Sequence, residues 1–388
     1  MKIIHTSDWH IGRRFERESL VEEQQNFLDW LAATVEEHQV DLIIVAGDIY
    51  DRSQPAEDAV TLLDQGLNGL RAAGATVALI SGNHDNTHRL GFGARRQALG
   101  GVYFFADDQH APTPWVFATG DERVALVAVP FLDPYAVPAP RPATDGSPRA
   151  RTHQNVLVDA LEHGRNQLTL LDPMLSIAVV HAFVSGSEVS ESEKALSIGG
   201  ADKVDPSVLD GFDYVALGHL HRSQLISGRD AMAYSGSPLP YSFSEDHPKS
   251  VRLLELDGGG VSGVTTLPIP VGRPVVTLED TLDNLLTDPD YDRYLDHWVA
   301  ARLTDDTVQT QPMERLRKRF PHLVNLRYAN PRTGAVADLG DDNGSIEDRP
   351  REEVIFEFLE ELRDRPQTES ERDLVLTALA KAERQADA

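Results

Sequence analysis

The sequence predicts an α/β protein with a mostly parallel sheet, followed by a small α+β domain and a C-terminal helical pair. Buried-strand runs alternate with helical spacings through the first half of the chain. The composition changes near Pro270, and a stretch rich in Asp and Gly, 338–350, precedes the last segment. For 388 residues we expect two or three domains.

The alternation starts at the amino terminus. Residues 2–6 are predicted to form a short strand, and residues 18–37 carry apolar side chains at a helical spacing. The next run, 41–46, is apolar after its first residue, which is typical of a strand buried on both faces in a parallel sheet. A helix over 55–73 and a strand over 76–80 follow. This order predicts parallel strands joined by right-handed crossovers.

The rest of the first domain, which we place at 1–270, follows the same rules. Helices are expected at 89–99 and 152–171, and the Pro- and Ala-rich stretch 133–151 is expected to be an irregular loop. Expected strands are 101–105, 124–129, 176–180 and 213–217, followed by three antiparallel strands at 232–234, 251–256 and 264–269.

The second domain, 271–337, is expected to hold a few short strands and helices. The strands are predicted at 298–303 and 323–328, and the helices at 281–286 and 313–320. Residues 338–350 are predicted to be a linker, and 351–388 to form two short amphipathic helices. A helical pair of that size needs a surface to dock on, either a partner or its own domain.

Composition excludes several classes of protein. The net charge of −26 argues against binding nucleic acid by bulk electrostatics, because phosphate contacts usually rest on clustered Lys and Arg. The chain contains no cysteine, so disulfides, thiolate metal sites and cysteine nucleophiles are absent. The amino terminus lacks the apolar core of a signal peptide and no later run is long enough to span a membrane, so we expect a cytoplasmic protein.

Side chains that can bind metal follow five of the predicted strands, each at the point where the strand ends. They are Asp8, His10, Asp48, Asn83, His84, His181, His219 and His221. Each alone is ordinary, because an Asp or Asn after a strand is usually a turn residue or a helix cap, and a lone His usually belongs to the core or the surface. Their repetition in a chain without cysteine predicts a metal site.

The types of side chain narrow the choice of metal. Carboxylate, amide and imidazole ligands together suit divalent Mn, Fe or Zn better than Ca or Mg. Gly47 allows a sharp turn after its strand, so Asp48 is expected at the carboxyl edge of the sheet. Because a carboxylate has two oxygens, Asp48 is the candidate to bridge two cations about 3.5 to 4 Å apart.

Five motifs resemble, in order, those of the calcineurin-like metallophosphoesterases. They are Asp8-x-His10, Gly47-Asp48-x-x-Asp51, Gly82-Asn83-His84-Asp85, His181 and Gly218-His219-x-His221. More narrowly, 6–12, 234–238 and Ser242-Phe243 resemble the SbcD family, the nuclease subunits of bacterial DNA-repair complexes. The resemblance covers nearly the whole chain and is weakest in the second domain. It implies a layered sheet sandwich flanked by helices, with a DNA-selecting capping domain at 271–337.

The resemblance also implies a role for each motif residue. One metal ion would be held by Asp8, His10, Asp48 and His221, and the other by Asp48, Asn83, His181 and His219, with Mn as the favoured metal. His84 is left to contact the scissile phosphate and to help protonate the leaving sugar oxygen. Asp51 and Asp85 are expected to orient ligating imidazoles. Archaeal and eukaryotic relatives often carry a second histidine where Asp51 stands, so the resemblance does not extend to phosphate contact at that position.

Positively charged side chains next to these motifs are candidates for DNA contact. Arg13 and Arg14 follow the first motif and Arg89 follows the third, where they could guide DNA phosphates toward the metals. The alternative is that each is an ordinary solvated surface charge.

The implied activity is that of a nuclease that digests double-stranded DNA from 3′ to 5′ and cleaves hairpins. The implied assembly is a homodimer under the control of an SbcC-like ATPase of the SMC family, on whose coiled coil residues 351–388 would dock. No nucleotide is expected to bind this chain. Two alternatives stay open: a phosphoesterase acting on phosphoproteins or cyclic nucleotides, which would need neither the second domain nor the tail, and an inactive scaffold that recruits the ATPase, against which the intact ligand set argues.

Overall fold

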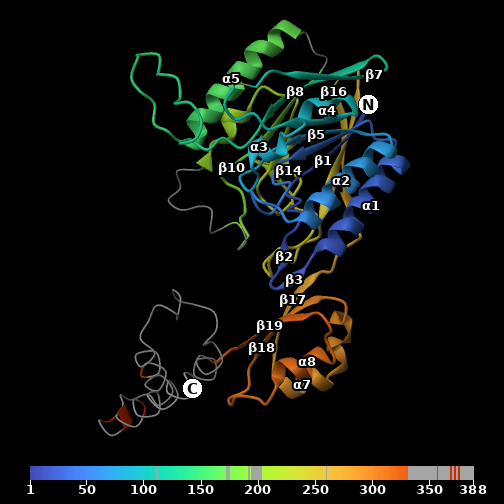
Figure 1. Ribbon diagram of the computed structural model, residues 1–388, viewed down its shortest axis with the longest axis vertical. Coiled ribbons are helices and arrows are strands. Elements are labelled where there is room, and N and C mark those ends of the chain that lie inside the picture. Colours follow the sequence, from blue (N-terminus) through green and yellow to red (C-terminus); the bar gives the residue numbers. More distant parts are fainter. Residues whose placement is uncertain are drawn as a thin grey trace, which may run out of the picture. The chain divides into compact units, whose positions relative to one another are not determined.

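The computed structural model describes residues 1–110, 112–171, 175–190, 193, 203–258 and 260–330, together with positions 356, 368, 371, 372 and 375. The chain divides into two compact units, Met1–Arg273 and Pro274–Ala388 (Figure 1). The expected linker lies outside the described residues, and so does nearly all of the expected helical tail. The capping role of the second unit and the docking role of the tail stay predictions.

The first unit is built on two six-stranded sheets. Alternation alone predicted a single sheet, whereas the layered sheet sandwich that the resemblance implied is confirmed. The first sheet has the order β16 (Gly260–Pro268), β15 (Ser250–Asp257), β1 (Lys2–Thr6), β4 (Leu42–Ala46), β5 (Thr76–Ile80) and β6 (Val102–Phe105). Its strands β1, β4, β5 and β6 are parallel, as expected. Strands β15 and β16 add to β1 in antiparallel fashion.

The second sheet has the order β13 (Gln224–Ile226), β14 (Arg229–Tyr234), β12 (Tyr214–Gly218), β9 (Ser176–His181), β8 (Glu122–Val129) and β7 (Trp115–Thr119). The prediction of an antiparallel strand at 232–234 was wrong in part, because β14 runs parallel to β12 and is antiparallel only to β13. The edge strand β7 was not predicted. Its side chains are mostly half-buried, so it lacks the alternation that marks a strand.

Helices cover the outer face of each sheet (Figure 1). Helices α1 (Val21–His38) and α2 (Glu57–Ala72) pack on the first sheet, and α5 (His153–Leu171) packs on the second. The helix expected at 89–99 is two short helices, α3 (Thr87–Leu90) and α4 (Ala94–Leu99). Gly93 separates them because it adopts a φ of 75°, which a helix cannot contain.

Strand β4 shows how the layers share one buried element. All five of its residues are buried, as predicted. Ile43 and Val45 belong to the core beneath α1 and α2, whereas Leu42, Ile44 and Ala46 belong to the core between the two sheets. The apolar run therefore has a helical layer on one face and the second sheet on the other.

Small elements complete the first unit and place loops around the strand ends. They are the hairpin β2 (Arg14–Phe15) with β3 (Glu18–Ser19), the pair β10 (Phe183–Val184) with β11 (Lys203–Val204), and the 3₁₀ turn η1 (Pro206–Leu209). The predicted loop at 133–151 contains no helix or strand along its fully described length.

The second unit is a small fold of strands and helices, as predicted, and its described residues include a third strand that was not predicted. Its parallel strands are β17 (Val275–Asp280), β18 (Trp298–Leu303) and β19 (Leu323–Tyr328), accompanied by α7 (Leu282–Thr287), η2 (Pro289–Tyr294) and α8 (Pro312–Arg317). Leu285, Leu316 and Phe320 lie in its core. Within the described part of the chain, no helix is both long and apolar enough to cross a membrane.

Candidate metal centre

The predicted ligands come together at facing edges of the two sheets. β1, β4 and β5 of the first sheet lead into Asp8 with His10, Asp48, and Asn83 with His84, while β9 and β12 of the second lead to His181 and to His219 with His221. Asp48 lies at the end of its strand, as expected, but the ligands do not share one sheet edge, because the site joins two sheets. Apolar side chains packed between the sheets, such as Ile44 and Val179, hold the two edges in register.

Two glycines allow the sheets to approach at this point. A Cβ atom on Gly47 would collide with Nδ1 of His181, and one on Gly218 would collide with the carbonyl oxygen of Ala46. Gly47 also has a φ of 94°, a left-handed conformation that side chains rarely adopt. The close approach that brings ligands from both sheets together thus requires glycine, which has no side chain, at positions 47 and 218.

The backbone at the site is itself unusual. The φ angles of Asp8, His10, Asp48 and His219 are all positive. For residues other than glycine such angles are uncommon, and they cluster where surrounding structure fixes a side chain for function. The strain is consistent with a functional site and aims these side chains out of the regular strand alternation.

Asp48 lies at the centre of the cluster. Its Oδ2 atom is 3.5 Å from Nε2 of His10 and 3.5 Å from Nε2 of His181. Its other oxygen, Oδ1, accepts the backbone N–H of His84 at 3.0 Å. Burial raises the pKa of Asp48, but the neighbouring His181 and His10 outweigh it and hold that pKa well below its usual range. An ionised carboxylate therefore stands between two imidazoles.

On one side of Asp48, two imidazoles face each other. Nε2 of His10 lies 3.2 Å from Nε2 of His221. Asp8 joins them, because its ligand atom and theirs all lie within 4.8 Å of one another. Ser7 donates to Oδ2 of Asp8 at 2.6 Å, and the backbone N–H of His219 donates to Oδ1 at 3.0 Å. These two bonds fix the Asp8 carboxylate.

On the other side there are again two imidazoles, and an amide oxygen takes the place of the Asp8 carboxylate. Oδ1 of Asn83 lies 2.9 Å from Nε2 of His181 and 3.1 Å from Nδ1 of His219. His181 contacts the backbone with its other ring nitrogen, since Nδ1 lies 2.9 Å from the carbonyl oxygen of Ala46. Burial lowers the pKa of His219 to about 3, which keeps that ring neutral and able to bind a cation.

The residues present fit divalent cations. Three groups of potential ligands share members: Asp8, His10 and His221; His10, Asp48 and His84; and Asp8, Asp48 and His181. All the carboxylates and all the imidazoles except that of His84 are buried. Nδ1 of His10 is buried and has no hydrogen-bond partner within the described residues. A cluster of buried acceptors and facing imidazole nitrogens is what a cation would satisfy.

His84 lies beside the cluster. Its ring stacks edge-on against that of His10, with 4.7 Å between centroids. Its Nδ1 is 2.8 Å from the carbonyl oxygen of Asp51, which assigns the proton to Nδ1 and leaves Nε2 on the other side of the ring. Geometry alone also groups His84 with His10 and Asp48 as a potential ligand. It is half-buried, so substrate can reach it.

Asp51 and Asp85 support the site in different ways. Oδ1 of Asp51 is 3.7 Å from Nδ1 of His10, near enough to influence that ring. Asp85 instead accepts the backbone N–H groups of Ile49, Tyr50 and Gly82 at 3.0, 2.9 and 2.9 Å. We expected Asp85 to orient a ligating imidazole. Its carboxylate instead bonds backbone groups and joins the loops after β4 and β5.

Sequence reasoning missed several buried residues behind His221. Glu245 lies 3.1 Å from Nδ1 of His221, and Lys249 lies 2.6 Å from Glu245. Glu193 accepts the backbone N–H of His221, and Tyr241 donates to the carbonyl oxygen of Trp9 at 2.6 Å. The only sequence signal was the Glu-x-x-x-Lys spacing at 245–249, which is equally common on surfaces.

The three arginines proposed for DNA contact differ in their surroundings. Arg13 donates a hydrogen bond to Asp51 at 2.9 Å and lies over the ring of Tyr241, so its guanidinium group already has partners within the protein. Arg14 is exposed but bonds the carbonyl oxygen of Arg17. The exposed guanidinium of Arg89 makes no hydrogen bond or ion pair to the described residues. Of the three, Arg89 best fits a DNA contact.

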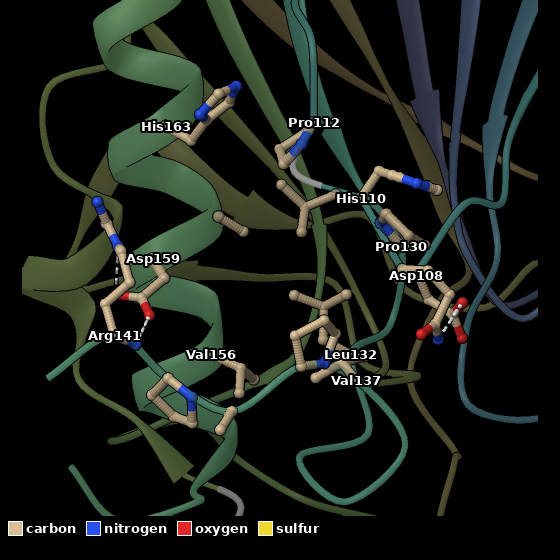
Figure 2. Close-up of a pocket in the computed structure, with 16 residues that line it drawn as sticks. Asp108, His110, Pro112, Pro130, Leu132, Val137, Arg141, Val156, Asp159 and His163 are labelled. Carbon is tan, nitrogen blue, oxygen red and sulfur yellow. Dashed lines mark hydrogen bonds and ion pairs between the residues drawn. The ribbon is translucent and has the colours of Figure 1, made fainter. Parts of the chain in front are cut away.

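A separate pocket lies away from these residues. A cavity of about 250 Å³ opens between α5, the loop at 130–141 and the residues at 108–110 and 112, and Val156, Leu132 and Val137 line it (Figure 2). Arg141 and Asp159 pair with each other at its rim. None of the predicted ligands is among its described lining residues. This apolar pocket is therefore distinct from the metal centre.

Comparison with known proteins agrees with this geometry. Residues 1–223 match the family described as calcineurin-like phosphoesterase. The chain belongs to that family. Residues 271–363 match a second family, described as the type 5 capsule protein repressor C-terminal domain and abbreviated SbcD_C. Membership identifies the fold as that of a metallophosphoesterase and implies bound divalent metals.

Curated relatives place the chain more narrowly. It is 31% identical over 314 residues to the D subunit of the nuclease SbcCD from Escherichia coli strain K12. The alignment covers 79% of this chain and 78% of that protein. The protein of strain O157:H7 gives the same values. This phosphoesterase is therefore SbcD-like. A dimetal phosphatase structure from Danio rerio aligns with 15% identity and a TM-score of 0.38 over 69% of this chain and 99% of its own, which is too distant to add to the argument.

Proposed function

We propose that this phosphoesterase is the DNA nuclease subunit of an SbcCD-type complex and hydrolyses phosphodiesters with two divalent cations, Mn being favoured. It digests double-stranded ends from 3′ to 5′ and cleaves hairpins. The observation that carries the two-metal proposal is the position of Asp48, whose Oδ2 is 3.5 Å from both His10 and His181. A carboxylate equally near two imidazoles fits a bridge between two cations. DNA as substrate is supported by the similarity to nuclease subunits.

The ligand sets that we propose divide around Asp48. Asp8, His10 and His221 with Asp48 form one position, and Asn83, His181 and His219 with Asp48 form the other. When bound, the cations supply Lewis acidity that activates water and offsets charge on the phosphate. Asp85 keeps the loops after β4 and β5 joined, which fixes Asp48 relative to Asn83.

His84 is proposed to handle the proton of the leaving group. Its Nδ1–H bond to the carbonyl oxygen of Asp51 fixes the ring, and the backbone N–H of His84 is bonded to Asp48. The opposite nitrogen, Nε2, is then free to face the scissile phosphate. Because the Nδ1 proton is held by Asp51, a second proton on Nε2 is needed, so the imidazolium form would donate its Nε2 proton to the departing sugar oxygen and become neutral. Because the ring is only half-buried, a strand of DNA can reach it.

The proposed assembly rests on the similarity to SbcCD subunits. An SbcC-like SMC-family ATPase is the proposed partner, with 351–388 as its docking segment and 271–337 as the capping domain that selects DNA. A homodimer is proposed on the same family resemblance.

One assay tests the proposal. Blunt duplex and hairpin DNA are incubated with Mn²⁺ and the wild-type chain or His84→Ser, each with and without the ATPase partner. We expect wild type to digest both substrates and His84→Ser to be slower by about 10²- to 10⁴-fold. Mn²⁺ binding should be unchanged, because the substitution removes the phosphate contact and the proton transfer but none of the proposed ligands. His110→Ser, at a histidine that is 81% exposed and belongs to none of the groups of potential ligands, is the matched control.

The outcome also separates the alternatives. Absence of DNA cleavage under every condition contradicts the nuclease proposal. Hydrolysis of a phosphoserine peptide or a cyclic nucleotide in its place would favour a different phosphoesterase, and Mn²⁺ binding without any hydrolysis would favour a scaffold.

A further inference from the structure

His221 is held from behind by two buried carboxylates. While Nε2 faces His10, Nδ1 lies 3.1 Å from Oε1 of Glu245 and 3.8 Å from Oε1 of Glu193. Glu193 also accepts the backbone N–H of His221. Both the ring and the backbone of this residue are therefore fixed by groups on the side away from the ligand cluster.

Glu245 is in turn fixed by Lys249. Nζ of Lys249 donates to Oε2 of Glu245 at 2.6 Å, to Ser237 at 2.9 Å and to the carbonyl oxygen of His221 at 3.3 Å. The contacts form a closed ring from His221 through Glu245 and Lys249 back to His221. The carboxylate cannot turn away without breaking several hydrogen bonds.

The pair is unusual because it is buried. Glu245 is 1% exposed, and the Lys249 side chain is 8% exposed. Removing two charges from water costs several kcal/mol, and a buried pair often stabilises a protein no more than apolar residues of the same size would. The position of this pair against a predicted ligand indicates a purpose other than stability.

The equivalent contact on the other half of the centre has no charge. His181 meets the carbonyl oxygen of Ala46 with its Nδ1 atom. A carboxylate that accepts from a ligating imidazole orients the ring and raises its basicity more strongly than a neutral carbonyl does. The two halves therefore differ in how firmly a ligating imidazole is presented.

We propose that Glu245, held by Lys249, is the positioning residue of His221 and sets the affinity of one of the two metal positions, the one formed by Asp8, His10, Asp48 and His221. The inference rests on the two-metal site of the proposed function. Outer carboxylates of this kind typically change metal affinity by about 10- to 100-fold. The position that contains His181 should not depend on Glu245.

Metal binding by the intact chain tests this directly, without an activity assay. Mn²⁺ is titrated calorimetrically into metal-free wild type, Glu245→Ala and Glu245→Gln, and the bound ions are examined by electron paramagnetic resonance. We expect Glu245→Ala to weaken one position by about 10- to 100-fold and leave the other unchanged. The spin-coupled signal of a Mn pair should then give way to that of a single ion at intermediate Mn²⁺. Glu245→Gln keeps an acceptor oxygen without the charge, so its loss should be smaller.

The control is another Glu–Lys pair four residues apart, on the surface of the second unit. Glu314 and Lys318 form an exposed i,i+4 pair at 3.1 Å in the second unit, so Glu314→Ala should leave both affinities unchanged. Circular dichroism first establishes that each variant is folded. If Glu245→Ala does not fold, the nearly isosteric Glu245→Gln decides.

Three results would overturn the inference. They are two wild-type affinities in a folded Glu245 variant, an equal loss at both positions, and a loss confined to the position that contains His181. If wild type itself binds no Mn²⁺, the proposed function fails together with the inference. If wild type binds two ions and the folded Glu245 variants bind both with the same affinities, only the inference fails.

Discussion

The two halves of the metal centre are supported by different parts of the protein. On one half, His221 is backed by the carboxylate of Glu245 at 3.1 Å, and His10 lies 3.7 Å from Asp51. On the other, His181 contacts the carbonyl oxygen of Ala46 at 2.9 Å. A side-chain carboxylate can be removed by one substitution, whereas a backbone carbonyl cannot. The first half can therefore be tuned by mutation, while the second is set by the packing of the two sheets.

Removing the charge that the halves share should have the largest effect. Asp48→Asn is nearly isosteric but neutral, so we expect both metal positions to be weakened and nuclease activity to fall by at least about 10³-fold. His10→Ala, by contrast, should chiefly weaken one position. Calorimetric Mn²⁺ titration measures both changes. Asp64→Asn, on the exposed face of α2, is the control. Two ions bound to Asp48→Asn with near wild-type affinity would show that the halves do not share this residue.

The half supported by backbone should respond to the packing of the sheets. A Cβ atom at Gly218 would meet the carbonyl oxygen of Ala46 and Nδ1 of His181. Because the backbone cannot swing aside, we expect Gly218→Ala to lower the free energy of unfolding by about 1–3 kcal/mol and to weaken Mn²⁺ at the His181 position. Urea unfolding without metal measures the first effect.

Gly69 provides the comparison for that substitution. A Cβ atom at Gly69, within α2, meets no atom within 4 Å, so Gly69→Ala should stabilise the fold by about 0.5–1 kcal/mol. Equal stability changes for the two alanine variants would mean that the sheets do not meet closely at Gly218.

The smallest effect is expected at Asp51. Its carboxylate lies 3.7 Å from Nδ1 of His10, beyond hydrogen-bond distance, and is shared with Arg13. Asp51→Asn should therefore weaken Mn²⁺ at the His221 position by only about 2- to 5-fold, less than Glu245→Ala, because a longer contact orients the ring less. The same titration compares the two. A larger loss for Asp51→Asn than for Glu245→Ala would reverse the order of support within this half.

Much of the centre could be predicted from the sequence because its ligands follow strands. Asp48, His181 and His219 each end or follow an apolar run, and such runs are visible without knowing what they pack against. The division into two sheets was implied by the motif resemblance but could not be predicted from the strand pattern itself. Strands β4 and β9 are equally apolar, and nothing in either shows that one lies opposite the other.

The supporting residues were missed for a different reason. Glu245 and Lys249 look like a surface pair, and their burial against His221 depends on how a loop folds back over 24 residues. Arg13 looks like a free cation in the sequence because its contact with Asp51 joins positions 38 residues apart. Contacts of this kind exist only in the folded chain and leave no local pattern.

The order of the ligands along the chain also bears on synthesis. The ligands run from Asp8 to His221, and β1 pairs with β15, whose last residue is Asp257. A nascent chain that still lacks β9 and β12 carries Asp8 and Asp48 without their partners from the second sheet. If the proposed activity is correct, a ribosome that stalls before residue 221 releases a fragment without a complete centre. Premature termination would then give an inactive product rather than an unregulated nuclease.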